Sequence, residues 1–386
     1  MKGNITIAGS LAQKPLQGGH SWVLLQYILG FKQLGWNVLF IDKLTKQMCL
    51  DAAGISCSAA QSLNWQVFES IMLDFGLQEQ FALLTDDRDE FMGMPRERVI
   101  KHVKNSVFLL NVMGFLEDED ILGEANRRVF LDIDPGFGQM WDKLGLADPF
   151  RNYHDHVTIG ENIGRPDCGV PTCGLSWITT PQPVVLNYWP AIFSENCDRM
   201  TSIMSWRGVY GPIDFNGKTY GLRAHEFRSF LQLPELTGQR FQLALNIHPD
   251  DFKDRDALEK HHWEILDPVM VAGNTRDYRS FIQDSAAELM IAKNMYVDTQ
   301  SGWFSDRSIC YLASGKPVVA QNTGLNTLYP GDEGLLLFGT VDEAVNAIKE
   351  LQADYPRHKR AARSIAEDCF ESGKVLTALL QKLNIS

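Results

Sequence analysis

The feature that most constrains the fold is an alternation of short apolar runs with amphipathic segments along almost the whole chain. Residues 4–9 are typical of a strand, residues 22–34 of a helix and residues 36–42 of the next strand. Further apolar runs at 106–116 and 127–134 are separated by an acidic, helix-prone segment, as buried parallel strands are. This pattern predicts an α/β fold built on parallel sheets.

The alternation starts again after a stretch rich in Gly and Pro that runs to about residue 190. Strand-like runs then begin with MTSIMSWRG, and helical segments such as VDEAVNAIKELQADY lie between them. A chain of 386 residues is too long for one compact core. We therefore expect two doubly wound, Rossmann-like domains that face a cleft. The expected boundaries are an N-terminal domain over 1–190, a C-terminal domain over 191–365 and a closing helix over 366–386.

Charge and composition exclude several classes of protein. The net charge of −12 argues against a nonspecific nucleic-acid or anionic-membrane surface, because phosphate binding needs a positive footprint. The start, MKGNITIAGSLAQ, does not have the pattern of a signal peptide, and no stretch has about 18 uninterrupted apolar residues. Seven scattered cysteines favour reduced thiols. We expect a cytoplasmic protein with no nucleic-acid partner and no integral membrane contact.

The sequence QGGH stands directly before the first predicted helix. Gly18 and Gly19 let the backbone adopt crowded conformations, so a ligand can approach the chain closely. The helix that follows presents free N–H groups and the positive end of its dipole at the same point. This arrangement predicts an anion site with His20 beside it. The alternative is a tight turn between strand and helix with an incidental histidine.

A second informative stretch is SGWFSDRSICYLASGKPVVAQNTG, residues 301–324. We expect a strand to end near Val297 and a helix to start around Arg307, again at the carboxyl edge of a sheet. Arg307 is suited to paired hydrogen bonds with phosphate oxygens, and Ser305 and Ser308 to donating to the same group. In the alternative interpretation, Asp306 is a plain N-cap and Arg307 is its surface partner.

These two stretches resemble the landmarks of GT-B glycosyltransferases, and nearly the whole chain fits that outline. The N-terminal landmark is matched by GGHSWVLLQYILGFKQLGWNVLFI and the C-terminal one by YLASGKPVVA. The resemblance implies a nucleoside diphosphate sugar as donor, held mainly by the C-terminal domain. Its phosphates are expected to lie against residues 305–308, Asp306 among them. The resemblance further implies a small-molecule or glycan acceptor, held mainly by the N-terminal domain, and no separate cofactor.

The resemblance also implies roles for particular residues. The two glutamates common in retaining members are absent, because Gly302 and Cys310 occupy their places. In inverting members the histidine that ends the glycine turn is the general base, which is the position of His20. The aspartate that often stands behind this histidine is replaced by Asn111, so Asp132 or Asp134 is a candidate for the orienting group.

The donor diphosphate is expected to be neutralised without a metal. The resemblance places basic residues after the first strand of the C-terminal domain, matched by Arg207 and Arg223, with Lys218 as an alternative. Thr323 and Gly324 are expected to bring backbone amides to the sugar. The Asp-x-Asp pair at 132 and 134 also fits a manganese site, but the fold that uses such a pair would not produce the second landmark.

We therefore expect an inverting, metal-independent transfer of a sugar to an acceptor hydroxyl, with His20 removing the proton. Two alternatives remain open, a nucleotide-sugar epimerase on the same fold and a noncatalytic sugar-nucleotide-binding protein. A Rossmann oxidoreductase is disfavoured because ITIAGSLAQKPLQGGH lacks the G-x-G-x-x-G spacing.

Overall fold

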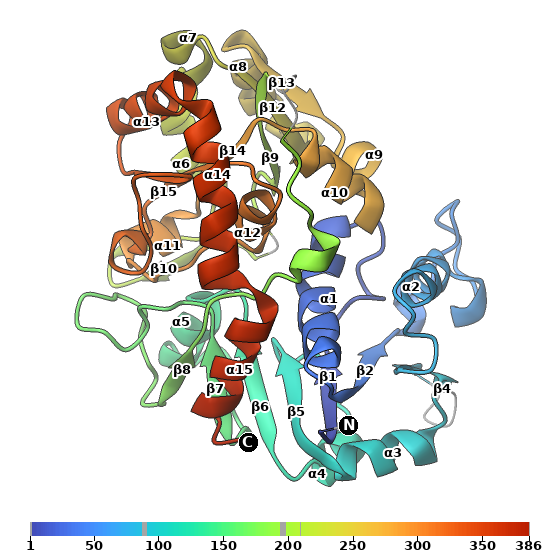
Figure 1. Ribbon diagram of the computed structural model, residues 1–386. Helices are drawn as coiled ribbons and strands as arrows, with labels where there is room; N and C mark the ends of the chain where they lie inside the picture. The colour runs from blue at the N-terminus through green and yellow to red at the C-terminus, as the bar shows by residue number, and fades with distance from the viewer. Residues whose placement is uncertain (1, 87–90, 194–197, 209, 386) are drawn as a thin grey trace.

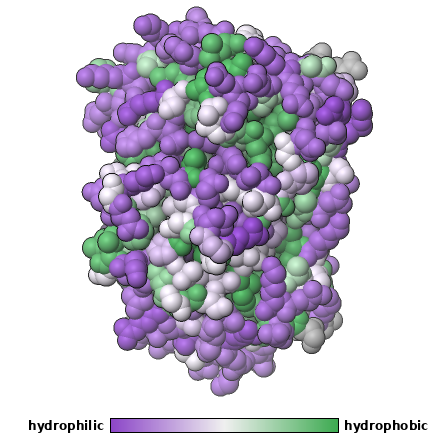
Figure 2. Space-filling view, turned by 90° about the vertical axis from the view of Figure 1, so that its left-hand side faces the viewer, coloured by the Kyte–Doolittle hydropathy of each residue, from purple (hydrophilic) through white to green (hydrophobic). Residues whose placement is uncertain are grey.

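The computed structural model describes residues 2–86, 91–193, 198–208 and 210–385. The strands form two separate parallel sheets, one in each half of the chain, with helices packed against them (Figure 1). Figure 2 shows one face of the molecule, on which hydrophilic residues are interspersed with smaller hydrophobic patches. None of the helices in the described ranges is both long and apolar enough to cross a lipid bilayer.

The N-terminal half contains an eight-stranded sheet in the order β4-β3-β2-β1-β5-β6-β7-β8. All neighbouring strands are parallel except β4, which pairs antiparallel with β3 at the edge. The strands are β1 (Asn4–Ala8), β2 (Asn37–Lys43), β3 (Phe81–Leu84), β4 (Phe91–Gly93), β5 (Ser106–Val112), β6 (Arg128–Asp132), β7 (Asp155–Thr158) and β8 (Trp177–Thr179). The helices are α1 (Gly18–Gln33), α2 (Leu63–Asp74), α3 (Arg96–Lys104), α4 (Glu119–Glu124) and α5 (Phe137–Lys143).

The C-terminal half contains a six-stranded parallel sheet in the order β13-β12-β9-β14-β15-β16. Its strands are β9 (Arg199–Ser205), β12 (Arg240–Asn246), β13 (Trp263–Leu266), β14 (Ala287–Met290), β15 (Val318–Gln321) and β16 (Leu335–Phe338). A hairpin of β10 (Ile213–Phe215) and β11 (Lys218–Tyr220) stands apart. The helices are α6 (Arg223–Phe227), α7 (Leu233–Thr237), α8 (Phe252–Lys260), α9 (Pro268–Ala272), α10 (Thr275–Gln283), α11 (Asn294–Asp298), α12 (Asp306–Ala313) and α13 (Val341–Ala353).

The end of the chain returns from the C-terminal half to the N-terminal one. Helix α14 (Tyr355–Ile365) continues through a π-helical turn (Ala366–Phe370) into α15 (Ser372–Lys382), which packs against α1. The predicted α/β class with parallel sheets is therefore confirmed. The domain boundaries at residues 190 and 365 stay predictions.

The prediction of where one strand ends is wrong. The run LMIAKNMYV was expected to remain extended to about Val297, but β14 ends at Met290 and α11 begins at Asn294. The cause is a pair of contacts with residues that are distant in the sequence. The amide of Asn294 accepts from the backbone N–H of Gly221 at 2.9 Å and donates to the carbonyl of Thr219 at 2.8 Å, which fixes a turn at this point.

The two halves are joined where the first turn of α1 meets α10 and the residues before it. A Cβ added to Gly18 would lie 2.3 Å from the carbonyl oxygen of Asn274, and one added to Gly19 would lie 2.8 Å from the ring of Tyr278. One turn further along α1, the indole Nε1 of Trp22 donates to the carbonyl of Thr275 at 2.9 Å. The group that approaches these two glycines most closely is therefore the C-terminal half of the protein itself.

Polar contacts also connect the two halves at a second place. The amide of Asn162 donates to the carbonyls of Gln300 and Gly324, both at 3.1 Å, and Gly160 and Trp303 form an isolated β-bridge. Buried apolar residues from both halves also belong to one continuous cluster. The joint therefore combines polar contacts with apolar packing between the two halves.

We predict that Gly18→Ala destabilises the protein by about 1–3 kcal/mol, because its methyl group meets backbone oxygen atoms rather than a flexible side chain. Urea denaturation measures this effect. Gly123→Ala in α4 is the matched control, because an added Cβ there meets no atom within 4 Å and alanine favours a helix. Equal stability of the Gly18→Ala variant and the unsubstituted protein would contradict the account of the joint.

Candidate functional site

A cleft of about 1180 Å³ lies between the two halves, at the carboxyl ends of the strands of both sheets. In doubly wound α/β folds ligands bind at this edge. The N-terminal half lines the cleft with residues 14–20 and 133–134, and the C-terminal half with residues 203–205, 245–248, 265–269 and 306–307. Of the predicted site residues, seven line this one cleft: Gly18, Gly19, His20, Asp134, Arg207, Asp306 and Arg307.

The N-terminus of α1 opens into the cleft without a cap. The N-cap residue, Gln17, makes no side-chain hydrogen bond to the helix, and the first turn holds no acidic residue. The first hydrogen bond of the helix runs from the N–H of Ser21 to the carbonyl of Gln17 at 3.1 Å. The N–H groups before it have no partner within the helix and line the cleft, which favours an anion at this point.

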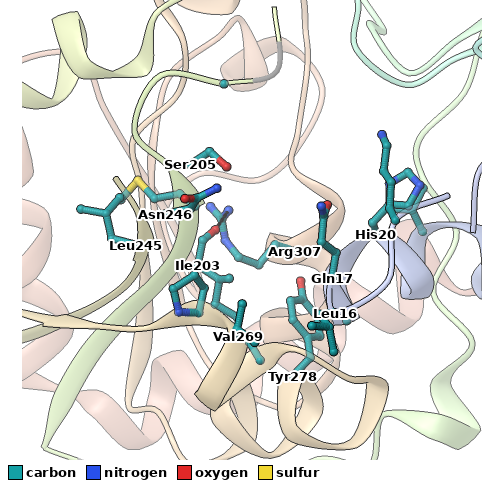
Figure 3. Close-up of a pocket in the computed structure, with 18 of the residues that line it drawn as sticks. Leu16, Gln17, His20, Ile203, Ser205, Leu245, Asn246, Val269, Tyr278 and Arg307 are labelled. Carbon is teal, nitrogen blue, oxygen red and sulfur yellow. Dashed lines mark hydrogen bonds between the residues drawn. The ribbon is translucent and has the colours of Figure 1, made fainter. Parts of the chain in front are cut away.

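Arg307 reaches the cleft from the other half, but it is not the surface residue of the alternative interpretation. Its Nε forms a buried ion pair with Glu288 of β14, and its Nη1 donates to the carbonyl of Ile203 at 2.6 Å. The side chain is only 8% exposed and that of Glu288 is fully buried. Among the described residues Nη2 has no partner, so a fixed guanidinium presents one free nitrogen (Figure 3).

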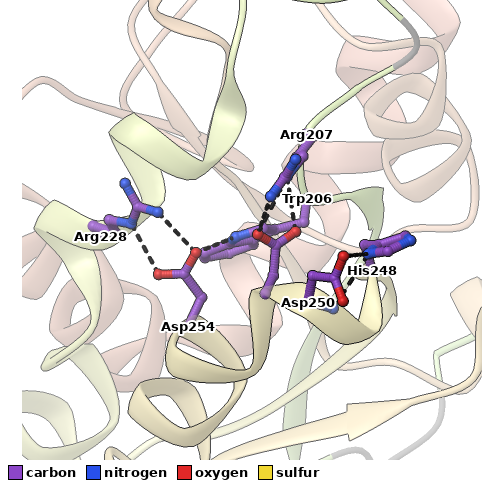
Figure 4. A network of polar contacts seen from close by, with 7 residues as sticks. Trp206, Arg207, Arg228, His248, Asp250 and Asp254 are labelled. Atoms are coloured by element: carbon purple, nitrogen blue, oxygen red, sulfur yellow. Dashed lines mark hydrogen bonds and ion pairs between the residues drawn. The ribbon is translucent and has the colours of Figure 1, made fainter.

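Two other predicted cations take different positions. Arg207 lines the cleft with an exposed side chain that is paired with Asp251 through two nitrogens (Figure 4). Arg223 does not line the cleft. Its Nη1 donates to the carbonyl of Ser205 at 3.3 Å, and burial, with the nearby charge of Arg307, lowers its pKa to about 10. Arg223 is therefore partly buried beside Ser205, which does line the cleft, and its direct contact with the donor stays a prediction.

Four residues that were predicted to contact the donor are buried inside the protein. Ser305 is buried as the N-cap of α12, where its hydroxyl accepts from the N–H of Arg307, and Ser308 is fully buried. Thr323 donates to the carbonyl of Trp303 at 2.6 Å, and the carbonyl of Gly324 accepts from Asn162. None of the four lines the cleft, and direct contact of Ser305, Ser308, Thr323 and Gly324 with the donor stays a prediction.

Asp306 is the first residue of α12 and does line the cleft. It is not the N-cap, because Ser305 holds that position. Burial raises the pKa of its carboxyl to about 6, with the charge of Arg307 acting in the opposite direction. The carboxyl of Asp306 therefore titrates at a higher pH than an exposed aspartate does.

His20 is held by a hydroxyl and not by a carboxylate. Its Nε2 lies 3.1 Å from the Oγ of Ser10, and burial, followed by the charge of Lys14, lowers its pKa to about 3. The imidazole is therefore neutral at ordinary pH. Asp132 does not orient it, because the carboxylate of Asp132 is buried and accepts from Gln139 at 2.7 Å and Thr158 at 2.9 Å.

The Asp-x-Asp pair is occupied by protein donors. Asp134 bridges the two halves, since both its oxygens lie 3.0 Å from Nζ of Lys293 and one also accepts from the hydroxyl of Tyr296. Asp132 is engaged as described above. In the part of the chain that the structure describes, no group of three or more His, Cys, Asp or Glu side chains is arranged to hold a metal ion. Metal independence stays a prediction.

Several residues of the cleft were not found from the sequence. Ser205, Asn246 and Asp267 stand at or directly after the ends of β9, β12 and β13, and all three line the cleft. Figure 3 shows Ser205 and Asn246. The signal was present, because each is a polar residue at the end of an apolar run and parallel strands end at one edge. Lys14 carried no such signal, because it lies in an irregular loop.

No protein-family model and no curated protein sequence matches this chain. Solved structures do match along its whole length. An alpha-glucosyltransferase in complex with UDP and a 13-mer DNA containing an HMU base has a TM-score of 0.62 and 13% identity, with 100% of both chains covered. Anabaena Alr3699/HepE in complex with UDP-glucose has a TM-score of 0.57 and 12% identity, with 99% of both chains covered.

Sucrose-phosphate synthase from Thermosynechococcus elongatus matches with a TM-score of 0.56 and 12% identity, again over 99% of both chains. At such identities the likeness concerns the fold. The chain has the GT-B fold that these glycosyltransferases share, as its sequence predicts. The absence of a nucleic-acid partner stays a prediction, and one of the matching structures contains DNA.

The buried pair of Arg307 and Glu288 gives a prediction about stability. Glu288→Gln leaves the guanidinium without its counter-charge, and breaking a buried pair costs about 3–5 kcal/mol. Urea denaturation should show a loss of this size, whereas the double variant Glu288→Leu/Arg307→Met should recover most of it.

The matched control is Glu264→Gln, which breaks an exposed pair with Arg240. An exposed pair contributes at most about 1 kcal/mol. A Glu288→Gln protein that loses no more stability than Glu264→Gln would show that the guanidinium of Arg307 is not held by this carboxylate.

Proposed function

We propose that this protein is a glycosyltransferase that moves a sugar from a nucleoside diphosphate sugar to an acceptor hydroxyl. The observation that carries the proposal is the cleft, where an uncapped helix N-terminus, the free edge of Arg307 and the neutral His20 come together. The cleft occupies the ligand-binding edge of a GT-B fold, and the matching structures named above contain UDP or UDP-glucose.

The donor would lie against the C-terminal half. Ile203, Leu245 and Val269 form an apolar wall on which a nucleobase can pack, with the amide of Asn246 among them (Figure 3). Ile247 also lines the cleft. The diphosphate would lie between this wall and the first turn of α1, where N–H groups and Arg307 both donate to anionic oxygens. These donors stabilise the departing diphosphate without a metal.

His20 would accept the proton of the acceptor hydroxyl. The neutral imidazole has the protonation state that a base needs, and Ser10 holds its Nε2 side. Burial is the main cause of the low pKa of His20, and the positive charge of Lys14 is the second. A bound diphosphate brings negative charge next to the ring, which raises the pKa toward the range in which a base works well. Direct attack on the donor sugar would invert its anomeric configuration.

Gln17→Asp tests the diphosphate site. The new carboxylate at the N-cap would occupy the free N–H groups of α1 and place a negative charge where the diphosphate lies. We predict that UDP binds about tenfold more weakly, while the free energy of unfolding rises by up to about 1 kcal/mol. Calorimetry with UDP and urea denaturation measure the two effects.

Gln78→Asp is the matched control, because it adds the same charge at an exposed position that does not line the cleft. Unchanged UDP affinity in the Gln17→Asp protein would remove the N-terminus of α1 from the donor site.

His20→Ala tests the proposed base. We predict that kcat falls about 10²–10⁴-fold while UDP affinity changes little, because a lost acid–base group acts on the chemical step. Since the free imidazole has a pKa of about 3, kcat/KM of the unsubstituted enzyme should stay level from pH 8 down to about pH 5. NMR of the product should show an inverted anomeric carbon. Near-normal turnover of the variant, or a retained configuration, would overturn this role.

A further inference from the structure

Lys14 is a cation of the cleft that the proposed donor site does not use. It lies in the loop between β1 and α1, and its Nζ is 5.3 Å from the ring centroid of Phe115. The side chain is partly buried and lines the cleft. Among the described residues, no carboxylate lies within 4 Å of this ammonium group and no hydrogen bond reaches it.

Hydrogen bonds from neighbouring residues hold the loop that carries Lys14. The buried carboxylate of Asp42 accepts the backbone N–H of Ala12 at 2.5 Å and the side-chain amide of Gln13 at 2.9 Å. Asn64 donates to the carbonyl of Ala12 at 2.8 Å. The backbone directly before Lys14 is therefore held in place, so a ligand that binds the ammonium group does not have to order this part of the loop.

The carboxylates that act on the charge of Lys14 are both engaged with other groups. Desolvation lowers the pKa of Lys14, and Asp134 and Asp42 act in the opposite direction. Asp134 is paired with Lys293 through both oxygens, and Asp42 accepts from Ala12 and Gln13. A partly buried charge without a partner costs free energy. A negatively charged ligand group at this point would remove that cost.

The position relative to His20 indicates which substrate supplies this group. Figure 3 shows Gln17 between Arg307 and His20, with His20 on the side away from the C-terminal wall. The charge of Lys14 acts directly on His20. Lys14 therefore belongs to the N-terminal side of the cleft, where the hydroxyl that gives up its proton would lie.

We propose that Lys14 binds a negatively charged group, a phosphate or a carboxylate, on the sugar acceptor. This inference rests on the proposed function, since it takes His20 as the point at which the acceptor reacts. It makes Lys14 a specificity-determining residue that selects anionic over neutral acceptors.

The test is an NMR titration with glucose, glucose 6-phosphate and glucuronate, each with and without saturating UDP. We expect the unsubstituted protein to bind at least one anionic sugar at least tenfold more tightly than glucose. Comparison of glucose 6-phosphate with glucuronate shows whether a phosphate or a carboxylate is preferred. Lys14→Met should abolish the preference and Lys14→Arg should keep it. Lys359→Met is the matched control, because Lys359 also lies over aromatic rings but outside the cleft.

Two results would overturn the inference. One is an unsubstituted protein that shows no preference for either anionic sugar. The other is a Lys14→Met protein that loses affinity for UDP while its preference among the sugars is unchanged, because Lys14 would then serve the donor. Failure of the proposed function is a separate result: the unsubstituted protein would not bind UDP, whereas the sugar titrations without UDP still test Lys14.

Discussion

The packing of α1 against α10 is the contact on which the rest of the cleft depends. Gly18 and Gly19 have no side chains, so the first turn of α1 lies against the backbone of Asn274 and the ring of Tyr278. This close approach fixes the free N–H groups of α1 opposite Arg307 of α12, which comes from the other sheet. Both groups that suit an anion are therefore set in place by one joint between the halves.

Buried charges keep this geometry. Arg307 is held by Glu288 and Asp134 by Lys293, and each pair lies at the edge of the cleft. Charges fixed in a dry environment need no rearrangement when a substrate arrives, which is the condition for strong electrostatic stabilisation of a leaving group. The same arrangement explains why the two acidic residues that resemble a metal pair serve structure. Asp132 binds Gln139 and Thr158, and Asp134 joins the two halves.

The fold was predictable because its strands and helices are periodic in the sequence, and the two landmarks fell in the expected halves. The site was only partly predictable. His20 and Arg307 stand at element ends, where a pattern marks them, whereas the burial of Ser308 and Thr323 depends on what packs over them. The end of β14 was missed because Asn294 turns the chain through contacts with the distant Gly221 and Thr219. The partner of His20 was missed because Ser10 lies in an irregular loop.

A crystal structure of the protein with UDP tests the central claim most directly. The account predicts that the diphosphate accepts hydrogen bonds from the N–H groups of Gly18, Gly19 or His20 and from Nη2 of Arg307, and that the Arg307–Glu288 pair stays intact. It also predicts that the two sheets keep their relative position. A diphosphate bound away from both α1 and Arg307, or a crystal that holds no UDP at saturating concentration, would contradict it.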